Sequence, residues 1–433
     1  MIFMNLFAAL DMGITPHVII VLYMIMLLAF GIIGYLKSKT SEEDYYLAGR
    51  DQGVLVTSLT IMATMFSSAA MLGIPGLIYK DGVAFLFFTL NLPLSGAAIY
   101  ILGSRIWRIG RTRGYITPAD LVTDCYGGSG LLRSLIALVG FLYVIPYIVM
   151  QIKAGGYLAQ RMFPDVESIL FMGQEIGIFE MGTIALSILT MLYVLIGGMR
   201  SVAWTDVVQG ILLLSGMLVA GTATVMAMGG PVSFFGQLSE LQPEALSVPG
   251  PSGIWSPWKL MTLCMFASLS TMIQPGQWMR YYAASSPKTL KRSAIVFSTL
   301  LPCCFLFGVM LVGLGARALY PPILENGVLM PHPAVGSQAG GFDQVVVAML
   351  QEHVPLLLGP TLGVVIVSLI LVAIMAASMS TADSNLHALS AVLTRDVYDR
   401  FIRPGAGEKE RAWFGRGVIV VATLLALWLV NLG

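Results

Sequence analysis

The stretch that decides the fold reads Ala-Ala-Ser-Met-Ser-Thr-Ala-Asp-Ser and covers residues 376–384. It lies in an apolar run, residues 355–392, that is long enough to cross a bilayer as a helix. In hydrocarbon a carboxylate and a row of hydroxyls are costly, and they usually bind something. One face of that helix would carry Ala377, Ser380, Thr381 and Ser384. With Asp383 beside them, these oxygens predict a site for a hard cation such as Na⁺.

The composition indicates a helical protein that crosses the membrane many times. Of the 433 residues, 57% are hydrophobic and 11% are charged, against about 25% charged in soluble domains. Apolar runs of membrane-spanning length recur along the chain. The expected spans, within one transmembrane domain over residues 1–433, are 17–36, 54–79, 83–103, 131–160, 180–198, 204–228, 256–279, 290–316, 355–393 and 414–432.

The basic residues are distributed unevenly between the two sides of these spans. Nineteen of the 24 Lys and Arg residues, with Arg133, Arg200 and Arg280 among them, fall on one side. The positive-inside rule then predicts a multi-pass protein of the cell (inner) membrane with its N-terminus outside. We expect its partners to be the lipid bilayer and a small solute, and not a nucleic acid.

Two of the apolar segments are interrupted by glycine and proline. One contains Gly73-Ile74-Pro75-Gly76, a cluster that should not continue a regular helix, and the other contains Gln274-Pro275-Gly276. They lie five spans apart and would run in opposite directions. Such a pair is typical of inverted-repeat transporters, whose broken helices meet at the membrane midplane.

Four stretches in the same order resemble the sodium/solute symporter family, which includes sodium-coupled sugar, proline, pantothenate, sialic acid and monocarboxylate carriers. They are Tyr45–Arg50, Gly197–Gln209, Gln274–Tyr281 and Ala377–Tyr398. The resemblance implies a leucine-transporter-like fold of two inverted five-helix repeats preceded by one extra helix. It also implies alternating access driven by Na⁺. Four spans follow the sixth, so the second repeat would lack its last helix and the usual later ones.

The resemblance also implies a main Na⁺ site. Its ligands would be the carbonyls of Ala63, Phe66 and Ala377 and the hydroxyls of Ser380 and Thr381. An unwound helix frees carbonyls that an intact helix uses internally, and hard cations take about five or six oxygens. The competing interpretation is that the two hydroxyls bond back to carbonyls of their own helix.

The resemblance also suggests a second cation site, formed by Asp206, Asp383 and Ser384. Two carboxylates around one site repel unless a cation or proton separates them. Asp206 could instead cap the N-terminus of the sixth span. Asp383 could instead pair with Arg200 or another cation on the inner side.

The solute should lie between the two breaks. Its expected ligands are Ser67, Ser68, Gln151, Lys153, Ser270, Thr271 and Gln274, with Tyr147 nearby. Helix N-termini at the breaks favour an anionic group. Lys153 would either bind a carboxylate or extend to the outer surface. The hydroxyl-rich pocket favours a small organic acid, whereas positions typical of proline carriers hold Met65, Ala267 and Thr271 here.

The leading hypothesis is therefore a Na⁺-coupled symporter, with Na⁺ as the co-transported ion and no organic cofactor. A different class is the membrane domain of a larger sensory protein, because symporter-like domains also occur fused to kinase modules. No metalloprotease or nucleophile–base motif supports an enzyme. No repeated filter loop supports a channel.

Overall fold

The computed structural model describes residues 13–37, 41–163, 166–171, 174–325, 328–335 and 341–432. Within them the chain is almost entirely helical. The α-helices are α1 (Thr15–Lys37), α2 (Glu42–Leu47), α3 (Val54–Met65), α4 (Ile74–Asp81), α5 (Asn91–Ala98), α6 (Ser104–Arg113), α7 (Pro118–Cys125), α8 (Gly130–Met162), α9 (Ile178–Ala227), α10 (Pro231–Ser239), α11 (Pro257–Ile273), α12 (Pro275–Ala283), α13 (Pro287–Leu306), α14 (Val309–Leu319), α15 (Val345–Leu358), α16 (Pro360–Val392) and α17 (Glu408–Leu432).

Short 3₁₀- and π-helical turns and two small hairpins complete the fold. The 3₁₀ turns are η1 (Ala48–Arg50), η3 (Gly82–Leu90), η5 (Pro243–Leu246) and η6 (Gly341–Gln344), and the π turns are η2 (Ala69–Gly73), η4 (Ile99–Gly103) and η7 (Leu393–Ile402). Strands β1 (Ser168–Phe171) and β2 (Gln174–Gly177) pair antiparallel, as do β3 (Ile323–Glu325) and β4 (Val328–Met330). In the part of the chain that the structure describes, seven helical segments are long and apolar enough to cross a membrane.

The first break lies earlier than the glycine and proline residues predict. Helix α3 ends at Met65, Phe66 has φ −98° and ψ 87°, and the chain becomes helical again at η2. At Gly73-Ile74-Pro75-Gly76 the π turn η2 passes directly into α4, so the regular α-helix is disturbed there as predicted, but the chain stays helical and the break lies elsewhere. Pro75 sits at the start of α4, where its missing N–H matters least. Gly76 serves packing instead, because a Cβ there would come within 2.7 Å of the Phe342 carbonyl oxygen.

The second break lies at Gln274, between α11 and α12. Gln274 has an extended backbone (φ −65°, ψ 124°), and Pro275 begins the next helix. This follows from the sequence, since proline disfavours the helical conformation of the residue before it.

Two further boundaries differ from simple hydrophobic runs. Gly198, with φ 55° and ψ −147°, divides α9 between the stretches predicted as two spans. Gly359, with φ 80°, separates α15 from α16, so the predicted helix over 355–393 begins at Pro360 instead. Both conformations favour glycine. The kink at Gly198 lies where a span was predicted to end, whereas the boundary at Gly359 lies inside a span that hydropathy predicts.

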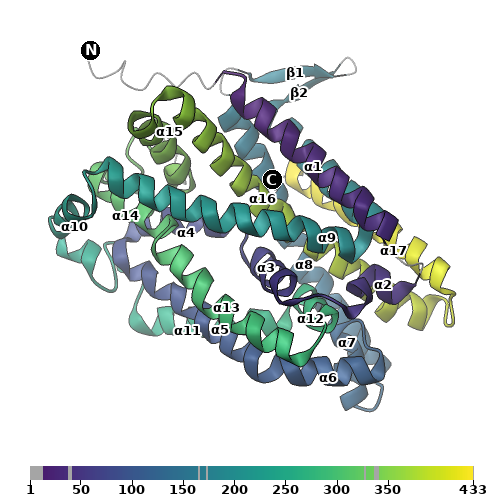
Figure 1. The fold of residues 1–433 in the computed structure, drawn as a ribbon. Coiled ribbons are helices and arrows are strands. Elements are labelled where there is room, and N and C mark those ends of the chain that lie inside the picture. Colours follow the sequence, from purple (N-terminus) through teal and green to yellow (C-terminus); the bar gives the residue numbers. More distant parts are fainter. Residues whose placement is uncertain are drawn as a thin grey trace.

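Helix α16 lies at the centre of the bundle. In its most apolar window 78% of the residues are buried, a far larger share than in a helix that faces lipid on one side. It packs against α8, α9, α15 and α1, and α9 packs in turn on α3 and α14. Figure 1 shows α9 crossing the middle of the molecule between α1 and the α3–α4 region. The polar residues of α16 are thus enclosed by protein.

A buried ion-pair cluster joins α7, α8 and η7. The guanidinium of Arg133 lies 2.9 Å from Asp120 and 2.5 Å from Asp396, and all three side chains are buried. Burial alone would raise the pKa of Asp120, but the Ile116 amide and the neighbouring Arg side chains outweigh it and lower that pKa. Arg133 was expected to be a loop charge, and the structure shows that it is buried.

Candidate functional site

The end of α3 meets the polar face of α16 at Ser380. The Ser380 hydroxyl lies 3.1 Å from the Ala63 carbonyl oxygen and 3.2 Å from the Ala377 carbonyl oxygen, and its side chain is fully buried. One contact is back-bonding within α16, as the competing interpretation expects, but the other crosses to the broken helix. Three of the five predicted Na⁺ ligands are therefore together.

Thr381, the fourth predicted ligand in this group, has a buried hydroxyl without a hydrogen bond to any residue that the structure describes. Leaving such a group unpaired costs about 1–3 kcal/mol. Back-bonding to its own helix, the alternative interpretation, is not found for Thr381. A hydroxyl that is buried, unpaired and next to freed carbonyls suits a ligand of a small hard cation.

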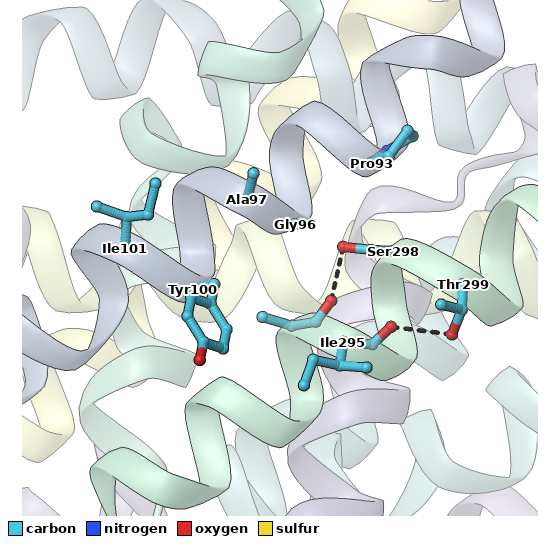
Figure 2. A pocket seen from close by; sticks show the side chains of 9 residues that line it. Pro93, Gly96, Ala97, Tyr100, Ile101, Ile295, Ser298 and Thr299 are labelled. Atoms are coloured by element: carbon cyan, nitrogen blue, oxygen red, sulfur yellow. Dashed lines mark hydrogen bonds between the residues drawn. The ribbon is translucent and has the colours of Figure 1, made fainter.

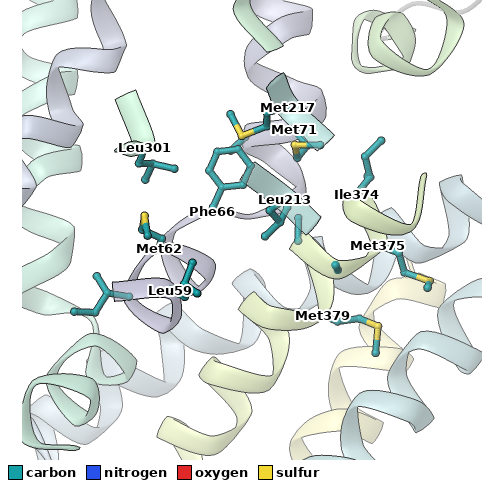
Figure 3. Packing of buried hydrophobic residues seen from close by; sticks show 14 of the residues in the cluster. Leu59, Met62, Phe66, Met71, Leu213, Met217, Leu301, Ile374, Met375 and Met379 are labelled. Atoms are coloured by element: carbon teal, nitrogen blue, oxygen red, sulfur yellow. The ribbon is translucent and has the colours of Figure 1, made fainter. Parts of the chain in front are cut away.

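The side chain of Phe66 holds the broken end of α3 in place. It is 2% exposed, and its ring lies edge-on to Phe305, with centroids 4.8 Å apart. Figure 3 shows it among Met62, Met71, Met217 and other apolar side chains. Because a buried aromatic ring contributes several kcal/mol of packing, the adjacent carbonyls are fixed although no helix holds them.

The predicted second cation site contains a side chain that was not assigned to it. Nη2 of Arg280 lies 2.9 Å from Oδ2 of Asp206 and also donates to the Ser384 hydroxyl. Oδ2 of Asp383 accepts from the Tyr193 hydroxyl at 2.7 Å. Asp206, Asp383 and Ser384 are thus close together, and the guanidinium of Arg280 lies between Asp206 and Ser384.

A helix-cap role for Asp206 and an Arg200 partner for Asp383 are not found, but Arg280, another cation predicted on the inner side, lies beside both carboxylates. Asp206 lies inside α9, well past the turn at Gly198, so it caps no helix. Arg200 does not pair with Asp383, because its guanidinium lies 2.5 Å from Asp44.

One face of α8 connects the two breaks. The side-chain oxygen of Gln151 accepts from the Ser68 hydroxyl at 3.0 Å, beside the first break. At the second break, Nε2 of Gln274 donates to the Tyr143 hydroxyl at 2.6 Å. The rings of Tyr143 and Tyr147 have centroids 5.6 Å apart. Residues 143, 147 and 151 are spaced by four, so they form one ladder along α8 from break to break.

Among the other predicted solute ligands, the side chain of Ser67 hydrogen-bonds Tyr147 of this ladder, whereas Lys153, Ser270 and Thr271 lie apart from it. Lys153 is about 200° around α8 from Gln151 and is half-buried, with no ion pair to any described residue. Ser270 and Thr271 donate to carbonyls of their own helix at 2.6 and 3.0 Å. Ser67 begins the turn after the first break, where its carbonyl accepts from the Ala70 and Met71 amides.

The chain matches the Sodium:solute symporter family over residues 45–432. It belongs to this family. It is 29% identical over 422 residues to the sodium/proline symporter of Escherichia coli K12, covering 94% of this chain and 74% of that protein. It is 24% identical over 417 residues to the sodium/pantothenate symporter of Haemophilus influenzae, covering 94% and 78%.

Solved structures show the same fold. A substrate-bound, outward-open Na⁺-coupled sialic acid symporter superposes with a TM-score of 0.76, at 22% identity, over 97% of this chain and 83% of that one. MhsT in complex with L-phenylalanine superposes with a TM-score of 0.57, at 15% identity, over 87% and 79%. The predicted leucine-transporter-like fold is confirmed.

Membership establishes the general activity. This symporter is a multi-pass membrane protein that couples Na⁺ to the movement of a small solute, and it is a secondary transporter and not an enzyme. The relatives are carriers, so they give no support to the sensory-domain hypothesis. The extra N-terminal helix and the absent final helices stay predictions.

Two apolar grooves lie elsewhere on the symporter. One, of about 300 Å³, runs between Gly96 and Ala97 on one wall and Ser298 and Thr299 on the other (Figure 2). Both hydroxyls donate to carbonyls of α13, so their protons are not free to bind a polar ligand. The second, of about 390 Å³, lies between α5 and α11. Neither contains a predicted site residue.

Three residues near the site were missed by the sequence reasoning. Arg280 follows a break and was expected to be a loop cation. Tyr143 lies four residues before Tyr147, a spacing that could have indicated it. Tyr193, which donates to Asp383, lies in an apolar stretch of α9, and no sequence signal distinguishes it from a core residue.

Proposed function

We propose that this symporter imports a small solute carrying a carboxylate, and that the driving Na⁺ binds Ala63, Phe66, Ala377, Ser380 and Thr381. The observation that carries the ion site is the unpaired, buried hydroxyl of Thr381, one residue after the hydroxyl that reaches Ala63. Carbonyl and hydroxyl oxygens are the donors that a hard cation prefers.

Na⁺ at this position would link the two halves of the transport machinery. One set of ligands belongs to the broken end of α3 and the other to α16, the central helix. The first solute ligand, Ser68, follows the same break by two residues. An ion that fixes the break therefore also fixes Ser68 and its partner Gln151, and occupancy of one site favours occupancy of the other.

Two helix N-termini support a carboxylate as the recognised group. The helical stretch that starts at Ala69 and the helix that starts at Pro275 both begin at the breaks. Their positive dipole ends attract an anionic group. Proline, pantothenate and sialic acid, for which the similar proteins are named, each contain a carboxylate. We place the protein in the cell (inner) membrane with its N-terminus outside, from the distribution of its basic residues.

The test is uptake into proteoliposomes that hold the purified chain. Labelled small carboxylates, amino acids and sugars are offered with an inward gradient of NaCl or of choline chloride. We expect Na⁺-dependent accumulation of a carboxylate. Accumulation of an uncharged sugar instead would overturn the solute class, and equal accumulation in choline would overturn Na⁺ coupling.

A pair of variants tests the ion site separately. Ser380→Ala removes a proposed ligand and should abolish Na⁺-dependent uptake. Ser378→Ala is the matched control, because Ser378 is equally buried on the same helix but donates only to the Ile374 carbonyl among described residues. Equal loss in both variants would contradict the assignment.

A further inference from the structure

The groove of about 300 Å³ between α5–η4 and α13 opens on the surface of the bundle that faces lipid. Ile101 and Ile295, one from each wall, are 58% and 54% exposed. In a membrane-spanning bundle, apolar side chains of this size lie exposed where hydrocarbon covers them. The groove is therefore within reach of lipid acyl chains.

The inside of the groove suits an apolar chain. The two walls meet at its floor, where a Cβ on Gly96 would overlap the Ser298 side chain. The Ser298 and Thr299 hydroxyls donate to carbonyls of α13 at 2.8 and 2.9 Å. Because both protons are used within α13, this part of the groove offers a polar solute little to bind.

One end of the groove is marked by a lysine over an aromatic ring. Nζ of Lys291 lies 5.0 Å from the centroid of the Tyr100 ring, within the range of a cation–π contact. Figure 2 shows Tyr100 and Ile295 towards the end of the groove away from Pro93. Lys291 lies one turn before Ile295 on α13, so its charge is at this same end. A lipid chain in the groove would bring its headgroup to Lys291.

Four further basic side chains lie around this end. The three basic residues of α13 are Lys288, Lys291 and Arg292. Each precedes a residue that lines the groove by seven positions, which is two turns along the same helix face. On the other wall, Arg105 and Arg108 lie one and two turns beyond the groove. Both helices thus continue from an apolar face into a basic one.

These five cations are not neutralised by the protein. None of them forms an ion pair with a carboxylate that the structure describes. Further along α6, Arg111 and Arg113 do form such pairs, at 3.9 Å with Glu43 and at 3.5 Å with Asp124. Positive charge is therefore compensated away from the groove and left uncompensated beside it.

This charge decides which lipid fits. An acyl chain gains little by leaving the bilayer for the groove, because hydrocarbon surrounds it in both places. Selectivity must then come from the headgroup, and Lys and Arg clustered at the membrane surface attract headgroups with a net negative charge. A zwitterionic headgroup carries its own cation and is attracted less.

We propose that this groove binds one anionic phospholipid, with an acyl chain between α5–η4 and α13 and the phosphate at Lys291. Helix α5 lies in the segment that follows the first break, and α13 lies in the segment that follows the second. The lipid thus links the segments beyond the two breaks at a place where their side chains leave space between them.

The test is native mass spectrometry of the purified chain in neutral detergent, titrated with phosphatidylglycerol or with phosphatidylcholine of identical acyl chains. One phosphatidylglycerol per chain should bind at least about tenfold more tightly than phosphatidylcholine. Lys291→Gln should weaken phosphatidylglycerol binding about fivefold, the effect of one basic residue near an anionic lipid. Equal affinity for the two lipids, or wild-type affinity in Lys291→Gln, would overturn the proposal.

Two variants separate the groove from the basic surface in general. Lys37→Gln is the matched control, because Nζ of Lys37 also lies over an aromatic ring, 5.6 Å from the Trp204 centroid, but α1 lines neither groove. It should bind phosphatidylglycerol as the wild type does, and a fivefold loss there would overturn the assignment to Lys291. Ala97→Leu fills the groove without changing a charge, and Ala97 is exposed, so the fold should tolerate it. It should weaken binding at least about fivefold, and an unchanged affinity would contradict a site in the groove.

The same spectra test a second copy of this chain as the occupant. A dimer that dissociates in Ala97→Leu would show that the groove is a subunit interface and would overturn the lipid proposal. The measurement needs neither Na⁺ nor solute, so its outcome is independent of the function proposed above.

Discussion

Replacing Thr381 with valine should stabilise the Na⁺-free protein and weaken its further stabilisation by Na⁺. The two side chains have nearly the same shape, so the change removes a hydroxyl and leaves the packing intact. That hydroxyl is fully buried and has no hydrogen bond to any described residue. In the ion-free protein this unpaired hydroxyl lowers the stability of the fold. In the ion-bound protein we propose that it is a ligand of Na⁺.

The magnitudes follow from those two roles. Without Na⁺, removing an unpaired buried hydroxyl should raise the free energy of unfolding by about 1–3 kcal/mol. With Na⁺, losing one charged-group contact of about 2 kcal/mol should weaken Na⁺ binding roughly 30-fold. At a Na⁺ concentration of about 100 times the wild-type Kd, the stabilisation by Na⁺ should fall from about 2.7 to about 0.9 kcal/mol.

The assay is thermal unfolding in detergent, in NaCl and in choline chloride at equal ionic strength. Thr423→Val is the matched control: Thr423 is as buried, but its hydroxyl donates to the Ile419 carbonyl at 2.8 Å. The control should keep the full difference in Tm between the two salts. The reasoning fails if Thr381→Val keeps that difference too, or if it loses stability in choline as a hydrogen-bonded threonine would.

Three further perturbations test other parts of the argument. Arg133→Gln leaves two buried carboxylates unpaired and should lower the free energy of unfolding, measured by chemical denaturation, by about 3–5 kcal/mol. Arg113→Gln removes an exposed ion pair and should lower it by less than about 1 kcal/mol in the same assay. Gly198→Ala should lower the free energy of unfolding by about 3 kcal/mol, since its φ is 55° and a Cβ would come within 2.7 Å of a carbonyl oxygen. Gly253→Ala, with φ 67° and open surroundings, should lower it by about 1 kcal/mol. Equal losses in the two variants would refute the packing argument. Gln151→Ala should raise the KM for solute uptake about tenfold or more and leave ²²Na⁺ binding unchanged, and an unchanged KM would remove Gln151 from the solute site.

The helices and the central polar stretch could be predicted because they depend on local pattern. A run of apolar residues predicts a membrane helix wherever it occurs, and polar atoms within such a run are costly enough to indicate a site. Ser380 and Thr381 were therefore predicted as ion ligands from the sequence. The second break could also be predicted, because proline restricts the residue that precedes it. In each case the determining residues are neighbours in the chain.

The first break and the role of Arg280 could not be predicted, because distant residues determine both. Phe66-Ser67-Ser68 contains no residue that ends a helix, and the break persists because the Phe66 ring packs on another helix and Ser380 binds the freed Ala63 carbonyl. Arg280 lies at the edge of an apolar run, as loop cations do, but its acceptors in α9 and α16 are 74 and 104 positions away. Both failures lie beside the proposed ion. A transport site must hold carbonyls free of their helix and charges free of water, and only contacts between distant segments stabilise such groups. The positions where local rules fail are therefore the ones that connect the ion to the broken helix.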